Sequence, residues 1–392
     1  MDLARARYLA SPNGRASLES LDPSLAALPA TQLADRLRRQ FPPSEAAALG
    51  EQLVLRAKAR ERFGSGRGLL ASAPGLEMMT HPLVAARRAA RLAAFGRPVV
   101  DLTAGLGGDL LASIEAGCDA VGVELDAPTA LLANANTAGR VALGDGTRPP
   151  AHLARAAAVI DPARRGASGR RFDPAAFVPR WHVALELLAS VAAGVMKAPP
   201  GIAHEQLPAG CETEFVQLGR SMREAAIWLG EGACPGLRRA VLLPGGHELT
   251  SLEPECDQAP VPLAAFVFDP ESCVTRAGLV RQLGTRLGAR LADQHLAYLT
   301  ADAPAFDPLC ATFGVLDVLP FSVRRLQQRL RERGWSPLEI RRRAFPVEPD
   351  ELRRLLGRVE GETVTLLCAT VAGERLVIIA RRLASADKCE GV

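Results

Sequence analysis

The sequence contains few aromatic residues and very little lysine. Aromatic side chains make up 4% of the 392 residues, and lysine occurs only at Lys58, Lys197 and Lys388. Arginine therefore carries almost all of the basic charge, which we attribute to a coding bias, and an arginine cluster alone is weak evidence of a binding site. The net charge of +4 is close to balanced and excludes no class of partner.

Long apolar runs and metal-binding cysteine patterns are also missing. No run of 18 or more apolar residues occurs, so no transmembrane helix is expected, and the first thirty residues lack the apolar core of a signal peptide. The eight cysteines form no Cys-x-x-Cys pair and no zinc-ligand spacing with histidine. We therefore expect a cytoplasmic protein with reduced thiols, no metal and no membrane association.

The chain is long enough for two or three domains, and its pattern of apolar residues changes along its length. Residues 1–96 have a helical pattern, whereas short apolar runs alternate with helical segments over 97–248. This alternation predicts an α/β domain whose mostly parallel sheet is covered by helices on both faces. We expect a connector with an accessory helix and strand over 249–311, and a small α/β domain over 312–385.

Positive charge is concentrated in two places. Residues 312–385 contain 14 arginines and nine acidic residues, an excess of five, which is larger than the net charge of the whole chain. Arg87, Arg88 and Arg91 lie on roughly one face of a predicted helix, and we expect that face to be exposed to solvent rather than bound to a ligand.

The stretch VVDLTAGLGGD, residues 99–109, predicts a ligand site at the end of a strand. Gly105 and Gly107 let a ligand approach the backbone, and the helix that follows favours an anionic group at its N-terminus. Asp101 and Asp109 flank the glycines and would repel a pyrophosphate. S-adenosylmethionine has an ammonium group, a sulfonium and a carboxylate, so we favour it over a nicotinamide dinucleotide, which stays the alternative.

Two further acidic residues follow the next strands. Glu124 ends the strand DAVGVEL, where a carboxylate can accept hydrogen bonds from both ribose hydroxyls of a nucleotide. Asp145, in VALGDG, follows a third short strand and is expected near an adenine amino group. Together with the glycine turn, these acids predict a site for a nucleoside with a small charged tail.

The motif VIDPARR predicts the chemistry. Asp161 ends the fourth strand at the carboxyl edge of the sheet, and Pro162 fixes the turn after it. A carboxylate there can hold the hydrogen of an acceptor and aim its lone pair at a methyl group. Arg164 and Arg165 follow, and Lys197 comes after the fifth strand; we expect these three to bind a phosphate or carboxylate, the alternative being an exposed basic loop.

The motifs DLTAGLGGD, GVELD, GDGT, DPARR and KAPPGI resemble class I S-adenosylmethionine-dependent methyltransferases, and most of all a bacterial group with a C-terminal THUMP-like domain. The resemblance implies a seven-stranded Rossmann-like sheet. It places cofactor contacts at Asp101, Gly105, Gly107, Glu124 and Asp145. We also expect cofactor contacts from Asp109 and from Thr103, which stands where the commonest motif has its first glycine. Asp161 and Pro162 match the start of the Asp-Pro-Pro-Tyr motif of nucleic-acid amino methyltransferases, in which Arg164 replaces the aromatic residue.

Three hypotheses follow for the function. The first is methyl transfer to RNA, either tRNA or rRNA, with the basic C-terminal domain binding RNA. The second is methyl transfer to a small molecule or a protein. The third is a non-catalytic RNA-binding protein on a methyltransferase scaffold, which the altered Asp-Pro-Pro-Tyr motif would explain.

Overall fold

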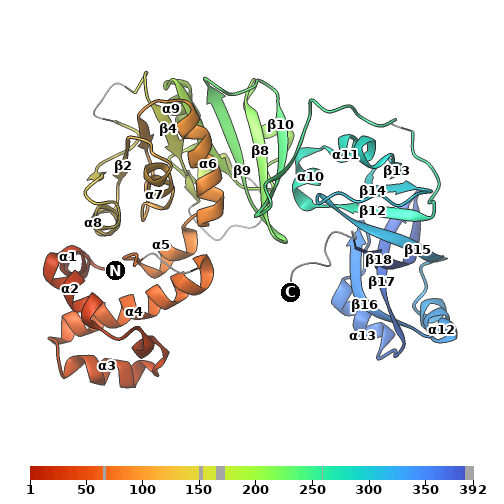
Figure 1. The fold of residues 1–392 in the computed structure, drawn as a ribbon, viewed down its shortest axis with the longest axis horizontal. Helices are drawn as coiled ribbons and strands as arrows, with labels where there is room; N and C mark the ends of the chain where they lie inside the picture. Colours follow the sequence, from red (N-terminus) through yellow and green to blue (C-terminus); the bar gives the residue numbers. More distant parts are fainter. Residues whose placement is uncertain (65–67, 150–152, 165–172, 258, 385–392) are drawn as a thin grey trace. The chain divides into compact units, whose positions relative to one another are not determined.

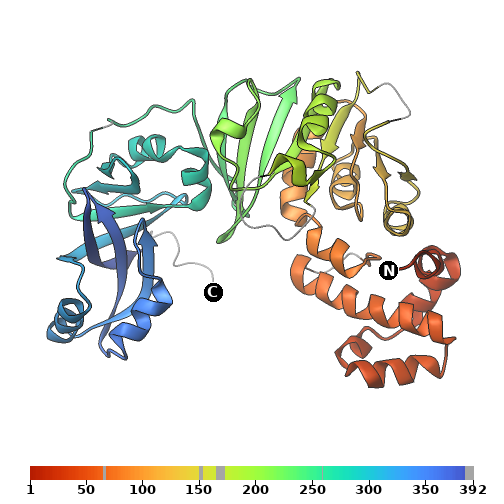
Figure 2. The same cartoon turned by 180° about the vertical axis from the view of Figure 1, so that it is seen from behind.

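The computed structural model describes residues 1–64, 68–149, 153–164, 173–257 and 259–384, as drawn in Figures 1 and 2. The chain forms two compact units. Unit 1 contains Met1–Glu212 and Arg223–Gly236, and unit 2 contains Thr213–Met222 and Leu237–Val392. The division into four segments made from the sequence stays a prediction.

Unit 1 begins with a group of helices (Figure 1). They are α1 (Leu3–Ala10), α2 (Pro12–Ser20), η1 (Pro23–Ala27), α3 (Ala30–Arg38), α4 (Pro43–Phe63), α5 (Ala73–Met78) and α6 (Pro82–Ala94). The side chains of Asp2 and Ser11 accept backbone hydrogen bonds at the starts of α1 and α2, which favours helices there. Buried leucines of this group pack in one cluster with Leu106 of the glycine turn and with Leu132.

The sheet of unit 1 is mostly parallel. Its strands are β1 (Val99–Asp101), β2 (Ala120–Glu124), β3 (Val141–Leu143), β4 (Ala157–Ile160), β7 (Ala193–Ala198) and β9 (Ser221–Gly230), in the order β9-β7-β4-β1-β2-β3. Among the described pairs of these six strands, β9 and β7 are antiparallel and the others are parallel. Every residue of β4 is buried, as expected for a strand with both faces covered. The predicted α/β fold is confirmed.

Helices α7 (Gly108–Glu115), α8 (Ala127–Asn136) and α9 (Trp181–Ala189) connect these strands. A small hairpin follows β4, in which β5 (Ala163–Arg164) pairs with β6 (Phe177–Val178).

Unit 2 contains β8 (Glu212–Leu218, of which Glu212 belongs to unit 1), β10 (Arg238–Leu243) and β11 (His247–Thr250), in the order β11-β10-β8. Its second sheet has the order β13-β14-β12-β15-β18-β17-β16. These strands are β12 (Phe266–Pro270), β13 (Arg290–Asp293), β14 (Leu296–Ala301), β15 (Cys310–Pro320), β16 (Trp335–Arg343), β17 (Glu362–Val371) and β18 (Glu374–Leu383).

Four helices complete unit 2: α10 (Ser272–Ala277), α11 (Val280–Leu287), α12 (Val323–Arg333) and α13 (Pro349–Leu356). Leucines of α12 and α13 share a buried cluster with residues of β16, β17 and β18, so both helices pack against this part of the sheet (Figure 2). In the described part of the chain, no helix combines the length and the apolar character that crossing a bilayer requires.

Candidate active site

A cavity of about 1040 Å³ lies at the carboxyl ends of the parallel strands of unit 1. Its lining includes the glycine turn after β1 and the residues that follow β2, β3, β4 and β7. Open α/β sheets bind ligands at this edge, and the volume reaches the upper end of the usual range for ligand pockets, ~300–1,000 Å³. The structure therefore brings most of the predicted site residues to one cavity.

Glycine is required at several points in and behind the cavity wall. Gly107 has a φ of 87°, and a Cβ there would lie 2.9 Å from Cγ2 of Thr137. Gly105 has a φ of 54° and lines the cavity, where a Cβ would meet no atom within 4 Å among the described residues. A Cβ on Gly146 would lie 1.9 Å from the carbonyl oxygen of Leu102. The backbone is therefore exposed to a ligand at Gly105 and closely packed behind it.

The acids that follow β2 and β3 both line this cavity. Oε2 of Glu124 accepts a hydrogen bond from the backbone N–H of Gly105 at 2.9 Å, and Oε1 accepts one from Asp126 at 2.8 Å. Each carboxylate oxygen can accept another, so Glu124 fits a pair of ribose hydroxyls. Asp145 accepts hydrogen bonds from the hydroxyl and the N–H of Thr147, which lower its pKa and keep it charged.

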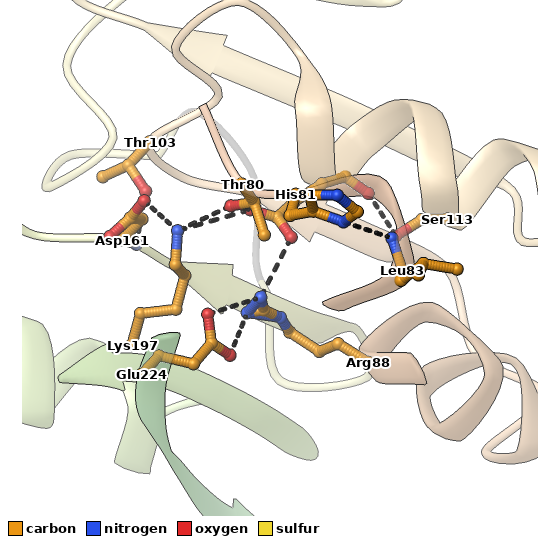
Figure 3. Close-up of polar contacts among 10 residues, drawn as sticks. Thr80, His81, Leu83, Arg88, Thr103, Ser113, Asp161, Lys197 and Glu224 are labelled. Atoms are coloured by element: carbon orange, nitrogen blue, oxygen red, sulfur yellow. Dashed lines mark hydrogen bonds and ion pairs between the residues drawn. The ribbon is translucent and has the colours of Figure 1, made fainter. Parts of the chain in front are cut away.

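Asp161 reaches the same cavity from the end of β4. Its side chain is 38% exposed, and one carboxylate oxygen accepts a hydrogen bond from Nζ of Lys197 (Figure 3). The backbone N–H of Asp161 donates to Oγ1 of Thr103 at 2.6 Å. Thr103 thus ties the glycine turn to the Asp-Pro motif, which a glycine at that position could not do. Pro162 also lines the cavity.

Lys197 occupies the centre of a polar network rather than an open surface (Figure 3). Its Nζ donates to Oγ1 of Thr80 at 2.7 Å and lies 3.7 Å from Oδ2 of Asp109. Burial lowers its pKa, but the carboxylates of Asp161, Asp109 and Glu224 outweigh burial and raise it, so the ammonium stays charged. The described contacts of Lys197 are with the hydroxyl of Thr80 and the carboxylates of Asp161 and Asp109. Binding of a phosphate by Lys197 stays a prediction.

Arg88 extends this network into the interior. Its guanidinium binds both carboxylate oxygens of Glu224, at 3.0 and 3.1 Å, and lies 3.2 Å from Oδ1 of Asp109. The other oxygen of Asp109 accepts a hydrogen bond from Thr80 at 2.8 Å. Burial raises the pKa of Asp109, but Arg88 and Lys197 outweigh it, so the pKa is lowered and the carboxylate stays charged.

The expectation of a solvent-exposed arginine face on α6 is wrong. The side chain of Arg88 is 3% exposed, and Arg91 binds the buried Glu212 at 2.6 Å and stacks 4.1 Å from the ring of Trp228. The acids that bind these arginines come from β8 and β9, more than a hundred residues away. Acids inside short apolar runs, Glu224 in EAAIWLG and Glu212 in ETEFVQL, were the sequence signals of buried cations.

Asp101 and Gly107 lie behind the cavity, outside the described lining. Oδ1 of Asp101 accepts a hydrogen bond from the N–H of Thr103 at 3.0 Å. Burial and the nearby Asp109 raise the pKa of Asp101 to about 8. Asp101 is therefore mostly protonated near neutral pH, and direct contact of either residue with a cofactor stays a prediction.

The contacts of Arg164 and Arg165 with a phosphate or carboxylate stay predictions. Arg164 contributes its backbone to β5, and Arg165 lies outside the described residues. Among the described residues, no group of three or more histidine, cysteine, aspartate or glutamate side chains has an arrangement that would hold a metal ion.

Comparison with known proteins identifies the family. Two proteins of Mycobacterium tuberculosis, from strains CDC 1551 and H37Rv, are named S-adenosylmethionine-dependent methyltransferases; each is 35% identical to this chain over 289 residues, which is 70% of this chain and 77% of the relative. The chain belongs to the S-adenosylmethionine-dependent methyltransferases. The predicted enzyme class and cofactor are thereby confirmed.

Two parts of the chain match described domain families. Residues 311–382 match a THUMP domain-like family, and residues 2–59 match a domain of unknown function, DUF8688. The crystal structure of a protein from Porphyromonas gingivalis W83, whose proposed activity is methyl transfer, has the same fold. It is 23% identical, covers 92% of this chain and 97% of its own, and superposes with a TM-score of 0.72.

Proposed function

We propose that this methyltransferase transfers the methyl group of S-adenosylmethionine to RNA, and that residues 311–382 bind the RNA. The observation that carries the proposal is the match of this segment to a THUMP domain-like family. The resemblance to the THUMP-like group implies RNA binding, because THUMP domains resemble the RNA-binding modules of RNA-modifying enzymes. The same segment holds the excess of arginine over acidic residues.

The charge on α12 and α13 supports this proposal. Six exposed arginines of these helices have no acidic partner among the ion pairs of the described residues: Arg324, Arg325, Arg331, Arg333, Arg353 and Arg354. Other arginines of the domain are bound internally, such as Arg341 and Arg343, which both bind the buried Asp269. The exposed arginines of the two helices are therefore available for phosphate groups.

The cavity residues suit the cofactor in both shape and charge. The described lining of the cavity contains six acidic side chains and two basic ones. This excess of acidic groups suits a ligand that carries an ammonium group and a sulfonium. On the other side of the cavity, Glu124 would accept the ribose hydroxyls and Asp145 the adenine amino group.

S-adenosylmethionine, when bound, supplies a methyl group on a positively charged sulfur. Asp161 would accept a hydrogen bond from the amino or hydroxyl group of the acceptor, direct its lone pair toward the methyl group, and receive the proton that leaves. Lys197 binds one carboxylate oxygen of Asp161, so it would orient the carboxylate. Thr103 would position the backbone of the same residue.

Transfer of a labelled methyl group in a fractionated cell extract tests the proposal. Label should enter the RNA fraction, resist protease and be released by ribonuclease, and the Asp161→Ala variant should bind the cofactor without transferring label. Label in protein or small molecules, with RNA unlabelled, would contradict the RNA assignment. Cofactor binding with no label in any fraction would favour a non-catalytic protein.

A further inference from the structure

Charged side chains are arranged in order along the edge of the unit 1 sheet. Glu124 and Asp145 follow β2 and β3 at one end, Asp161 follows β4 near the centre, and Lys197 belongs to β7. The last strand of this unit, β9, contributes Arg223, which lines the same cavity. Glu124 and Asp145 thus lie on one side of Asp161 and Arg223 lies on the other. If the nucleoside of the cofactor binds Glu124 and Asp145, the side of Arg223 is left for the acceptor.

Arg223 and Glu224 are neighbours with opposite surroundings. Side chains alternate between the two faces of a strand, and Glu224 is buried against Arg88 whereas Arg223 is exposed. In the parts of the chain that the structure describes, no acidic side chain forms an ion pair with Arg223. An exposed guanidinium at a cavity wall can bind a planar anion in a bidentate manner.

Two other basic side chains lie near Arg223. Burial lowers the pKa of His81, and the positive charges of Arg223 and Arg62 lower it further, so all three groups share one electrostatic neighbourhood. Arg62 donates hydrogen bonds to the backbone carbonyl groups of Leu76 and Glu77, which fix its position. The lowered pKa favours the neutral imidazole of His81, so Arg223 and Arg62 supply the positive charge in this neighbourhood, and an anion bound to Arg223 would be stabilised by it.

The rest of the cavity would repel a polyanion. Its described lining contains six acidic residues but only two basic ones, Lys197 and Arg223; the acids are Asp109, Glu124, Asp126, Asp145, Asp161 and Glu224. Lys197 is bound to Asp161 and to Thr80. Arg223 is thus the basic lining residue that is available to an anionic substrate, among the residues described.

We infer that Arg223 binds a backbone phosphate of the RNA next to the nucleotide that accepts the methyl group. This inference rests on the proposed function, because it assumes an RNA acceptor. It assigns a phosphodiester site to the catalytic unit itself, separate from the arginines of α12 and α13. The acceptor would then contact the enzyme through one phosphate at the cavity and through several on the C-terminal domain.

The salt dependence of RNA binding tests this site. Affinity for an RNA that the enzyme methylates is measured by fluorescence anisotropy at several salt concentrations, for the wild type and for Arg223→Gln, Arg223→Lys and Arg38→Gln. Loss of one phosphate contact should reduce the slope of log affinity against log salt by about one, or ~0.7 for single-stranded RNA. KM for RNA should rise about tenfold or more, with cofactor affinity unchanged.

The controls separate charge from structure. Arg38 is an exposed arginine at the end of α3, away from the cavity lining, so Arg38→Gln should leave the slope and KM unchanged. Arg223→Lys should keep the slope because it keeps the charge. An unchanged slope in Arg223→Gln, or an equal loss in Arg223→Lys, would contradict the inference. If the wild type methylates no RNA, the proposed function itself fails, and this outcome is distinct from the first two.

Discussion

The buried ion pair between Arg88 and Glu224 leads to the sharpest prediction about stability. The side chains are 3% and 7% exposed, and the guanidinium binds both carboxylate oxygens. Arg88→Met keeps much of the side-chain volume but leaves a buried carboxylate without its cation. Breaking such a pair costs about 3–5 kcal/mol, so the free energy of unfolding from urea titration, followed by tryptophan fluorescence, should fall by about that amount.

An exposed pair in the same unit provides the matched control. Arg97 binds both carboxylate oxygens of Glu231, at 2.6 and 2.7 Å, but these side chains are 31% and 55% exposed. Arg97→Met should therefore cost at most about 1 kcal/mol. Replacing both members of the buried pair, Arg88→Met with Glu224→Met, should recover part of the lost stability because no buried Glu224 carboxylate is left without a cation, although Asp109 still loses its contact with Arg88.

The destabilisation should also depend on pH. Burial already raises the pKa of Glu224 in the wild type, and without Arg88, which lowers it, the pKa should rise further. Above the ordinary pKa of a glutamate, ~4.3, the folded variant then binds a proton that the unfolded chain does not, so its stability falls as pH rises. The difference from the wild type should be smaller at pH 5 than at pH 8. Equal effects of Arg88→Met and Arg97→Met, at either pH, would refute this account of the network.

Three further predictions concern the cavity. Asp161→Asn should lower methyl transfer about 100-fold or more without changing cofactor affinity, measured by calorimetry beside the transfer rate; equal rates would remove Asp161 from the mechanism. The pKa of Asp101 is raised to about 8, so its burial lowers the free energy of unfolding as pH rises from ~4 to ~8. Between pH 5 and pH 8, the free energy of unfolding should therefore fall less in Asp101→Asn than in the wild type. Parallel pH profiles of the two proteins would contradict this. Gly146→Ala places a Cβ 1.9 Å from the carbonyl oxygen of Leu102, so the turn that carries Asp145 must shift, and cofactor affinity should fall about tenfold or more; unchanged affinity would show that the turn is adaptable.

Local motifs allowed much of the cavity to be predicted from the sequence. A strand followed by a glycine turn has few allowed backbone conformations. Acids at the ends of successive parallel strands must lie at one edge of the sheet. Asp161, Glu124 and Asp145 were therefore predicted to lie at a common site, and all three line one cavity. Periodicity likewise predicted the α/β fold, because buried parallel strands are short apolar runs.

The charge network was not predicted, for a physical reason. Periodicity shows which residues share a helix face but not what that face contacts. Arg88 and Glu224 are 136 positions apart, and Thr80 and Lys197 are 117 positions apart, so only the folded chain brings them together. The hydroxyl of Thr103 shows a similar limit, since its hydrogen bond to Asp161 spans 58 positions and appears in the sequence only as a departure from a glycine motif.

Methyl transfer onto RNA at Asp161 is the central claim, and mass spectrometry of nucleosides tests it most directly. RNA would be incubated with S-adenosylmethionine that carries a deuterated methyl group, together with the wild type or Asp161→Asn, and then digested to nucleosides. The account predicts a deuterium-labelled methylnucleoside with the wild type and at most a trace with the variant. The claim would be contradicted by equal label with both proteins, or by its absence with a wild type that binds the cofactor.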